Sequence, residues 1–215
     1  MKTTCCSTMR LFSLFLLTLV LIACGGSEKL PAIPAGSTVL ILGDSLSYGT
    51  GADKGQDYPT LLAKNTAWNI VNAGVPGDTS EQGLARLPGL LEQHQPIVLM
   101  IALGGNDFLR KVAVSETFAN LKKIIQTAQS KNRTILLIAI PDYQPVKAAF
   151  GGLEDHSLYA TLAEEMQVPL LEGIFSPVLS KNALKTDYVH PNAQGYQAVE
   201  VQLRESLAEL GLVAG

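Results

Sequence analysis

Five short apolar runs alternate with amphipathic stretches along most of this 215-residue chain. The runs lack polar alternation and are rich in Val, Ile and Leu, which is typical of strands buried on both faces. They occupy residues 38–42, 68–72, 97–103, 134–140 and 168–171. Because parallel strands need long crossover connections, the alternation predicts an α/β domain with about five parallel strands and helices on both sides of the sheet.

The stretches between these runs have the period of amphipathic helices. In the second of them, Leu84, Leu87, Leu90 and Leu91 fall on one helical face. The predicted helices are 58–65, 81–94, 115–131, 158–166 and 192–210. A chain of this length accommodates one such domain, which we expect over residues 38–215.

The N-terminus has the character of a targeting segment. Lys2 and Arg10 precede an apolar run, 11–23, that is too short to span a bilayer but suits a signal-peptide core. The run ends in Leu-Ile-Ala-Cys24-Gly25, which resembles a bacterial lipobox, and Gly25 rather than Asp after the Cys implies sorting to the outer membrane. The alternative is an ordinary secretory signal with a chance Cys24.

We therefore expect a signal peptide over 1–23 and a lipidated tether over 24–37, which is rich in Gly, Pro and Ser. The lipid on Cys24 would make the membrane a partner and would place the protein in the cell envelope, facing the periplasm. Cys5 and Cys6 would leave with the signal peptide, so the mature chain could form neither a disulfide framework nor a Cys-based metal site.

Charge and motifs exclude several classes of function. The formal net charge is −3 with a pI near 5.6, and no basic cluster interleaves with aromatic residues, so nucleic acid is a poor partner. Neither a Gly-x-Gly-x-x-Gly nor a Walker loop is present. His94 and His156 have no companions at metal-ligand spacing. We expect no cofactor and no metal.

Polar turns follow the first three apolar runs, where an open parallel sheet places its ligands. The first run leads into Gly-Asp44-Ser45, the second into Asn-Ala-Gly-Val-Pro-Gly77-Asp-Thr, and the third into Gly-Gly-Asn106-Asp107. Each turn alone is explained by helix capping and turn formation, and this explanation suffices for Asp44 and Asp107.

A fourth polar segment, Asp187-Tyr-Val-His190-Pro191-Asn, precedes the last helix. Pro191 keeps His190 out of the body of that helix, so Asp187 and His190 can face one point. A serine hydroxyl needs a base within hydrogen-bond reach, and the base needs a carboxylate that holds its tautomer. Ser45, Asp187 and His190 occur in one of the chain orders in which such triads recur.

Together these four segments resemble the conserved blocks of the SGNH (GDSL) hydrolase superfamily, and the similarity extends from about residue 38 to 210. Within it, the chain is similar to the bacterial thioesterase I, lysophospholipase and arylesterase lineage. The resemblance implies a three-layer α/β/α, flavodoxin-like fold. It also implies that Ser45, Asp187 and His190 are catalytic, and that Ser45 N–H, Gly77 N–H and the Asn106 amide form the oxyanion hole.

The resemblance further implies a serine esterase that hydrolyses acyl esters or thioesters through an acyl-Ser45 intermediate. Expected substrates are small acyl esters or lipids, such as lysophospholipids and aryl or short- to medium-chain esters. Two alternatives stay open, a carbohydrate O-acetylesterase and a non-catalytic lipoprotein that binds an apolar ligand. Apolar residues that would border an acyl chain are Phe108, Leu109, Val112, Val114, Val146, Phe150 and Leu153.

Overall fold

The computed structural model describes residues 29–129 and 133–213, and their centre is a five-stranded parallel sheet. The strand order is β2-β1-β3-β4-β5, the flavodoxin-like order that the resemblance implies. The prediction of about five parallel strands is confirmed. The strands are β1 (Thr38–Gly43), β2 (Asn69–Gly74), β3 (Val98–Ala102), β4 (Thr134–Ile138) and β5 (Leu170–Leu171).

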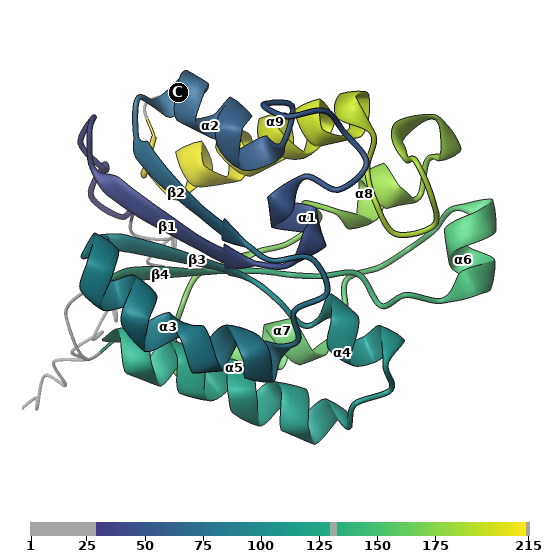
Figure 1. The fold of residues 1–215 in the computed structure, drawn as a ribbon, viewed down its shortest axis with the longest axis horizontal. Helices are drawn as coiled ribbons and strands as arrows, with labels where there is room; N and C mark the ends of the chain where they lie inside the picture. The colour runs from purple at the N-terminus through teal and green to yellow at the C-terminus, as the bar shows by residue number, and fades with distance from the viewer. Residues whose placement is uncertain (1–28, 130–132, 214–215) are drawn as a thin grey trace, which may run out of the picture.

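Five longer helices cover the two faces of the sheet and form the outer layers of a three-layer domain (Figure 1). Helices α3, α5 and α7 pack side by side on one face, and α2 and α9 pack together on the other. They are α2 (Tyr58–Thr66), α3 (Ser80–His94), α5 (Val114–Gln129), α7 (Leu158–Met166) and α9 (Ala193–Glu209). Each corresponds to one of the predicted amphipathic stretches.

Several short helices lie in the connections, and the sequence pattern did not predict them. Three to six residues make little more than one turn, which is too short to show a helical period. They are α1 (Ser45–Tyr48), α4 (Gly105–Leu109), α6 (Pro145–Phe150), α8 (Ser176–Leu179) and the 3₁₀ turn η1 (Asn182–Leu184). Of these, α1 and α4 begin directly after β1 and β3.

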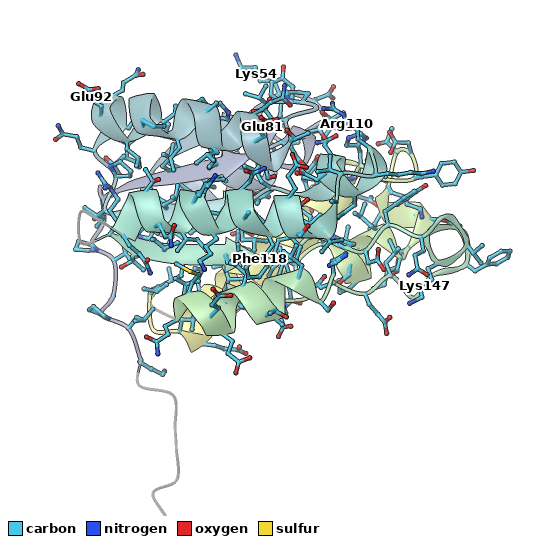
Figure 2. All side chains as sticks on the ribbon, turned by 90° about the horizontal axis from the view of Figure 1, so that it is seen from below. Lys54, Glu81, Glu92, Arg110, Phe118 and Lys147 are labelled. Carbon is cyan, nitrogen blue, oxygen red and sulfur yellow. The ribbon has the colours of Figure 1, made fainter. Side chains whose placement is uncertain are left out.

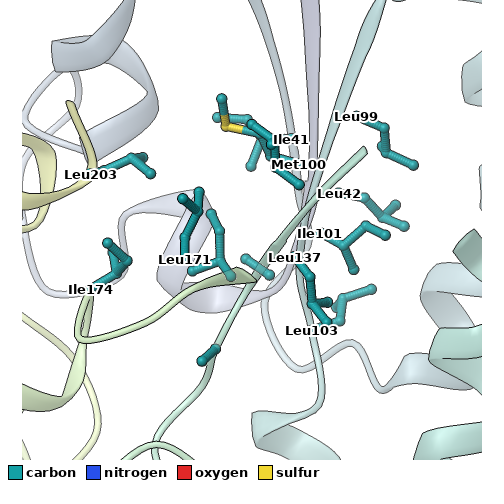
Figure 3. Close-up of a cluster of buried hydrophobic side chains, with 14 of the residues drawn as sticks. Ile41, Leu42, Leu99, Met100, Ile101, Leu103, Leu137, Leu171, Ile174 and Leu203 are labelled. Carbon is teal, nitrogen blue, oxygen red and sulfur yellow. The ribbon is translucent and has the colours of Figure 1, made fainter. Parts of the chain in front are cut away.

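The core consists of the central strands and the helix faces that meet them. Ile41 pairs in register with Met100, and both point toward the α9 layer, where Leu203 lies (Figure 3). Leu42 and Ile101 are also paired, and they point to the opposite face (Figure 3). All five side chains are fully buried, so both faces of β1 and β3 are covered as predicted.

The edge strands depart from the prediction of burial on both faces. Among the described strands, β2 pairs with β1 alone, and its Asn69 and Asn72 are exposed. The predicted run 68–72 begins one residue early, because Trp68 instead buries its ring and donates from Nε1 to the Ile33 carbonyl at 3.2 Å. At the other edge, β5 has only two residues.

The first described residues lie against the domain, at the end of the sheet where the strands begin. Leu30 N–H donates to the Leu210 carbonyl at 2.8 Å, and Ile33 N–H donates to the Leu212 carbonyl at 2.9 Å. The described part of the predicted tether therefore packs on the C-terminal turn. No helix within the two described ranges is both long and apolar enough to cross a membrane.

Substitutions in and beside the central strand β3 test which residues form the core. Leu99 in β3 is fully buried, whereas Ile97 just before the strand is 47% exposed. We expect Leu99→Ala to lower the free energy of unfolding by about 2–5 kcal/mol, because it leaves a cavity between sheet and helices. The exposed control, Ile97→Ala, should cost less than about 1 kcal/mol. Equal losses in urea unfolding would contradict this assignment of the core.

Candidate active site

Ser45 lies where β1 ends and the short helix α1 begins. Asp44 caps this helix, and its Oδ1 accepts the Leu46 N–H at 3.0 Å. The turn also lies close to the end of β2, where a Cβ on Gly74 would come within 2.4 Å of the Tyr48 nitrogen. Glycine at position 74 therefore lets α1 sit directly beside β2, with Ser45 at the carboxyl edge of the sheet.

The loop that carries His190 is fixed at its base and along its side. Lys185 and Pro191 form an antiparallel bridge, and Thr186 N–H donates to the His190 carbonyl at 2.9 Å. Thr186 Oγ1 also donates to the Gly51 carbonyl at 2.8 Å, which ties the loop to the segment after α1. This tie joins two segments that lie 135 residues apart in the chain.

Ser45, His190 and Asp187 form one chain of hydrogen bonds. The distance from Ser45 Oγ to His190 Nε2 is 2.9 Å, and that from His190 Nδ1 to Asp187 Oδ2 is 2.8 Å. A carboxylate only accepts hydrogen bonds, so Nδ1 carries the ring proton in the neutral imidazole. The Nε2 lone pair is then directed at the Ser45 hydroxyl.

Asp187 is held by its own loop. Its Oδ1 accepts the N–H groups of Val189 and His190, both at 2.8 Å. Partial burial pushes the pKa of Asp187 upward, but the hydrogen bonds from His190 and Val189 outweigh it, and the pKa lies below the ordinary 3.8. The Asp187 side chain is 51% exposed and that of His190 only 18%. The carboxylate is thus ionised while the imidazole is shielded.

Gly77 is in the loop after β2 and has a φ of +84°, a conformation that favours glycine. A glycine also lets a backbone donor approach a substrate closely, since it has no Cβ. Within the protein, space is not the constraint, because a Cβ at position 77 would meet nothing closer than the Arg110 Nη2 at 3.4 Å. The positive φ is therefore the local reason for a glycine at this position. Throughout the described residues, no protein acceptor pairs with the N–H of Gly77 or of Ser45.

Asn106 lies on α4, after β3, and its side-chain amide spans two neighbouring segments. Its Nδ2 donates to Asp44 Oδ2 at 3.1 Å and to the Asp78 carbonyl at 3.0 Å. An amide nitrogen has two hydrogens, so both have protein partners in this state. The arrangement joins the ends of β1, β2 and β3 through a single side chain.

Asp44 is more than the turn residue that the sequence suggested. The residue is only 2% exposed, and burial raises the pKa of its carboxyl group to about 6, against the lowering effects of the Leu46 N–H, His190 and Asn106. Asp107, also read as a turn residue, accepts the Ser80 N–H at 2.8 Å and thereby holds the start of α3.

Arg86 on α3 also contacts the turns of the site, although the sequence pattern did not indicate it. Its Nε donates to Asp78 Oδ2 at 2.7 Å, and its Nη2 donates to the Gly43 carbonyl at 2.9 Å. In the sequence it is a basic residue within a Leu-bearing helix, which usually indicates a solvated face. Here the Arg86 side chain is only 24% exposed.

A cavity of about 280 Å³ opens beside Ser45 at the carboxyl edge of the sheet. Ser45, Gly77, Asn106 and His190 line it together with mainly apolar residues. The apolar lining is Leu46, Pro76, Leu109, Ile140, Pro141, Tyr143, Leu153, Leu179 and Val189. The structure thus gathers the predicted site residues around one concave surface of the kind that binds small molecules.

Only part of the predicted acyl border lines this cavity. Leu109 and Leu153 do, but Phe108 stacks on His156 with ring centroids 4.3 Å apart. Val146 and Phe150 on α6 are 71% and 89% exposed. The sequence could not separate these cases, because short helices show no period that would assign a face.

The other two residues of the predicted acyl border, Val112 and Val114, do not line the cavity. Val114 is exposed at the start of α5, and Val112 borders a separate hollow beside Arg110. Arg110 itself donates to the Gly77 carbonyl at 2.7 Å and lies at the same end of the molecule as Lys147, opposite Glu92 (Figure 2). Among the described residues, no three His, Cys, Asp or Glu side chains cluster as a metal site. Cys24 lies outside the described residues.

Comparison with known proteins decides the family. The model of the GDSL-like Lipase/Acylhydrolase family matches residues 41–198, which is most of the chain. The chain belongs to this family. The match spans the turns after β1, β2 and β3 and the loop with His190, so the elements that build the cavity all lie within it.

Several proteins similar to this chain have names that describe an enzyme activity. The chain is 40% identical over 166 residues to Thioesterase 1/protease 1/lysophospholipase L1 of Escherichia coli (strain K12), covering 74% of this chain and 77% of the relative. It is 39% identical to Esterase TesA of Pseudomonas aeruginosa, covering 80% of this chain and 89% of the relative. An Arylesterase of Vibrio mimicus is 32% identical, with coverage of 83% and 90%.

Solved structures show the same fold. The crystal structure of TesA superposes with a TM-score of 0.71 at 30% identity, covering 81% of this chain and 99% of that one. The psychrotrophic esterase EstA from Pseudoalteromonas sp., inhibited by monoethylphosphonate, gives a TM-score of 0.70 at 28% identity, with coverage of 80% and 97%. This GDSL-family protein is a carboxylic ester hydrolase with an SGNH hydrolase fold.

The buried Asp44 predicts an unusual dependence of stability on pH. The folded state binds the Asp44 proton more tightly than the unfolded state, so ionisation between pH 3.8 and about 6 lowers the free energy of unfolding. At about 1.36 kcal/mol per pKa unit, the difference amounts to roughly 3 kcal/mol.

We therefore expect Asp44→Asn to gain about 3 kcal/mol relative to the wild type as the pH rises from below 4 to above 7. Urea unfolding of both proteins over this range measures the difference, and the other titrating groups cancel. Parallel stability curves would show that Asp44 titrates normally.

Proposed function

We propose that the protein hydrolyses acyl esters and thioesters through an acyl-Ser45 intermediate. The observation that carries this proposal is the continuous chain of hydrogen bonds from Ser45 Oγ through His190 to Asp187, at 2.9 and 2.8 Å, beside an apolar cavity. These distances are within the reach that a nucleophile and its general base require.

The proton follows this chain of bonds. His190 Nε2 takes the hydroxyl proton as Ser45 Oγ bonds to the carbonyl carbon, and the ionised Asp187 stabilises the imidazolium. The tetrahedral intermediate collapses as the C–O or C–S bond to the leaving group breaks, and His190 returns the proton to the departing alcohol or thiol. Water then repeats the sequence on the acyl-Ser45 ester and releases the acid.

Three donors are candidates to stabilise the oxyanion, namely the N–H groups of Ser45 and Gly77 and the amide of Asn106. The two N–H groups have no protein acceptor among the described residues, and all three residues line the cavity. Both hydrogens of Asn106 Nδ2 already have partners, so the oxyanion must share one with Asp44 or with the Asp78 carbonyl. Such preorganised donors require little reorganisation at the moment of reaction.

Fluorophosphonate labelling tests the nucleophile. We expect the probe to label the wild type and to leave Ser45→Ala unlabelled, because Ser45 Oγ is the one hydroxyl among the described residues that pairs with His190 Nε2. Ser47→Ala is the matched control, since Ser47 is fully buried and its Oγ pairs with Tyr58 OH at 2.7 Å. Undiminished labelling of Ser45→Ala would remove Ser45 as the nucleophile.

Asn106→Ala tests the oxyanion hole. We expect kcat to fall by about 10²–10³-fold with little change in KM, as the loss of a donor used mainly in the transition state should produce. Asn120→Ala, which removes an amide paired with Ser80 Oγ behind the site, serves as the control and should leave kcat near the wild-type value. A change confined to KM would mean that Asn106 positions the substrate.

The apolar lining of the cavity favours an acyl chain as the occupant. Relatives carry the names thioesterase, lysophospholipase, esterase and arylesterase, which supports lysophospholipids and aryl or short- to medium-chain esters as substrates. A carbohydrate O-acetylesterase would be expected to offer more polar partners to a sugar. Measuring the rates of hydrolysis of a lysophospholipid and of an acetylated xylan distinguishes the two functions. Activity on the acetylated xylan alone would overturn the assignment of an acyl-chain substrate.

We also propose that Cys24 is lipidated and anchors the protein in the cell envelope, with the site facing the periplasm. The lipobox-like sequence and the signal-type run before it support this proposal. Mass spectrometry of the mature N-terminus and fractionation of Cys24→Ala are the tests. A mature chain that begins elsewhere, or a variant that fractionates unchanged, would contradict it.

A further inference from the structure

Arg86 joins the two chain segments that carry the backbone donors of the site. One is the end of β1, where Gly43 precedes Ser45 by two residues, and the other is the loop after β2, where Asp78 follows Gly77. A single guanidinium contacts both, at 2.9 Å to the Gly43 carbonyl and at 2.7 Å to the Asp78 carboxylate.

The direction of α3 explains how one side chain reaches both segments. The helix begins at Ser80, directly after the loop, with Thr79 as its N-cap in a capping box with Gln82. Helical side chains tilt toward the N-terminus of their helix, so Arg86 extends back over the first turn toward the loop that precedes it.

The two contacts of Arg86 are shielded, and one of the two acceptors also accepts a backbone N–H. The Arg86 and Asp78 side chains are 24% and 10% exposed, and the Gly43 carbonyl also accepts the Val75 N–H at 3.1 Å. The Asp78 carbonyl in turn accepts from Asn106. Any movement of Asp78 would therefore displace both the peptide of Gly77 and the partner of Asn106.

We propose that Arg86 is a positioning residue that fixes the spacing of the oxyanion donors by bridging the Gly43 carbonyl and the Asp78 carboxylate. It touches neither the cavity nor the reacting atoms, and it acts through Ser45, Gly77 and Asn106. The inference rests on the proposed acyl-Ser45 chemistry. A planar guanidinium is needed because a Lys ammonium, as a point donor on a flexible stem, cannot hold both acceptors in one fixed geometry.

The test measures kcat and KM for 4-nitrophenyl butyrate in Arg86→Met and Arg86→Lys. We expect both variants to lose about 10–100-fold in kcat, the scale on which small misplacements of catalytic groups act, with KM within about twofold. Arg86→Lys retains a positive charge beside Asp78, so it carries the test if Arg86→Met does not fold. A Lys variant with wild-type kcat would overturn the proposal, because charge alone would then suffice.

Arg204→Met is the matched control, because Arg204 makes a comparable ion pair with Glu200 on α9, at 3.2 Å and away from the cavity. Arg204→Met should have the kcat of the wild type. Urea unfolding of every variant measures its free energy of unfolding, so that a loss of stability can be told from a loss of kcat. An equal loss of kcat in Arg204→Met would reduce the effect of Arg86 to general destabilisation and would overturn the proposal.

A double-mutant cycle separates positioning from an independent role. If Arg86 acts through the oxyanion donors, Arg86→Lys combined with Asn106→Ala should lose less than the product of the two single losses. Multiplicative losses would overturn the proposal. Full activity of Ser45→Ala would instead refute the proposed function itself, whereas a Ser45-dependent enzyme with unaffected Arg86 variants would refute only this inference.

Discussion

The site depends on the in-register parallel pairing of β1 with both β2 and β3. Gly43 is opposite Gly74 on one side and Ala102 on the other, so the three strands end at one level. The turns that carry Ser45, Gly77 and Asn106 therefore emerge side by side at the carboxyl edge, as open α/β sheets require. A one-residue slip would move each of these turns and exchange the faces of the buried side chains.

Polar contacts then fix the turns relative to one another. Asn106 joins Asp44 to the Asp78 carbonyl, Arg86 joins Asp78 to the Gly43 carbonyl, and Arg110 holds the Gly77 carbonyl. Burying the Asp44 carboxyl raises its pKa and so lowers stability once it is ionised. The same carboxyl group caps α1 and accepts a hydrogen bond from Asn106. An apolar side chain at position 44 could make neither contact.

His190 and Asp187 reach the site by a different route, since they come from a loop outside the sheet. The loop is closed by its own backbone bonds and tied to the segment after α1 through Thr186 and the Gly51 carbonyl. The short contact between His190 and Asp187 is local, three residues apart, and only the contact with Ser45 is long-range. The proposed site thus combines the carboxyl edge of the sheet with one anchored loop.

The sequence by itself determined the α/β class, the five strands and the five longer helices, because long periodic segments record which faces are buried. Polar turns at strand ends and a local Asp-x-x-His pair indicated Ser45, Asp187 and His190 as candidates, and the resemblance to the SGNH hydrolases added Gly77 and Asn106. Only the tertiary structure decided the contacts of Arg86 and Asp44, the short helices and the lining of the cavity. Those depend on contacts between residues distant in the chain, such as Arg86 with Gly43, and no local period or spacing encodes them.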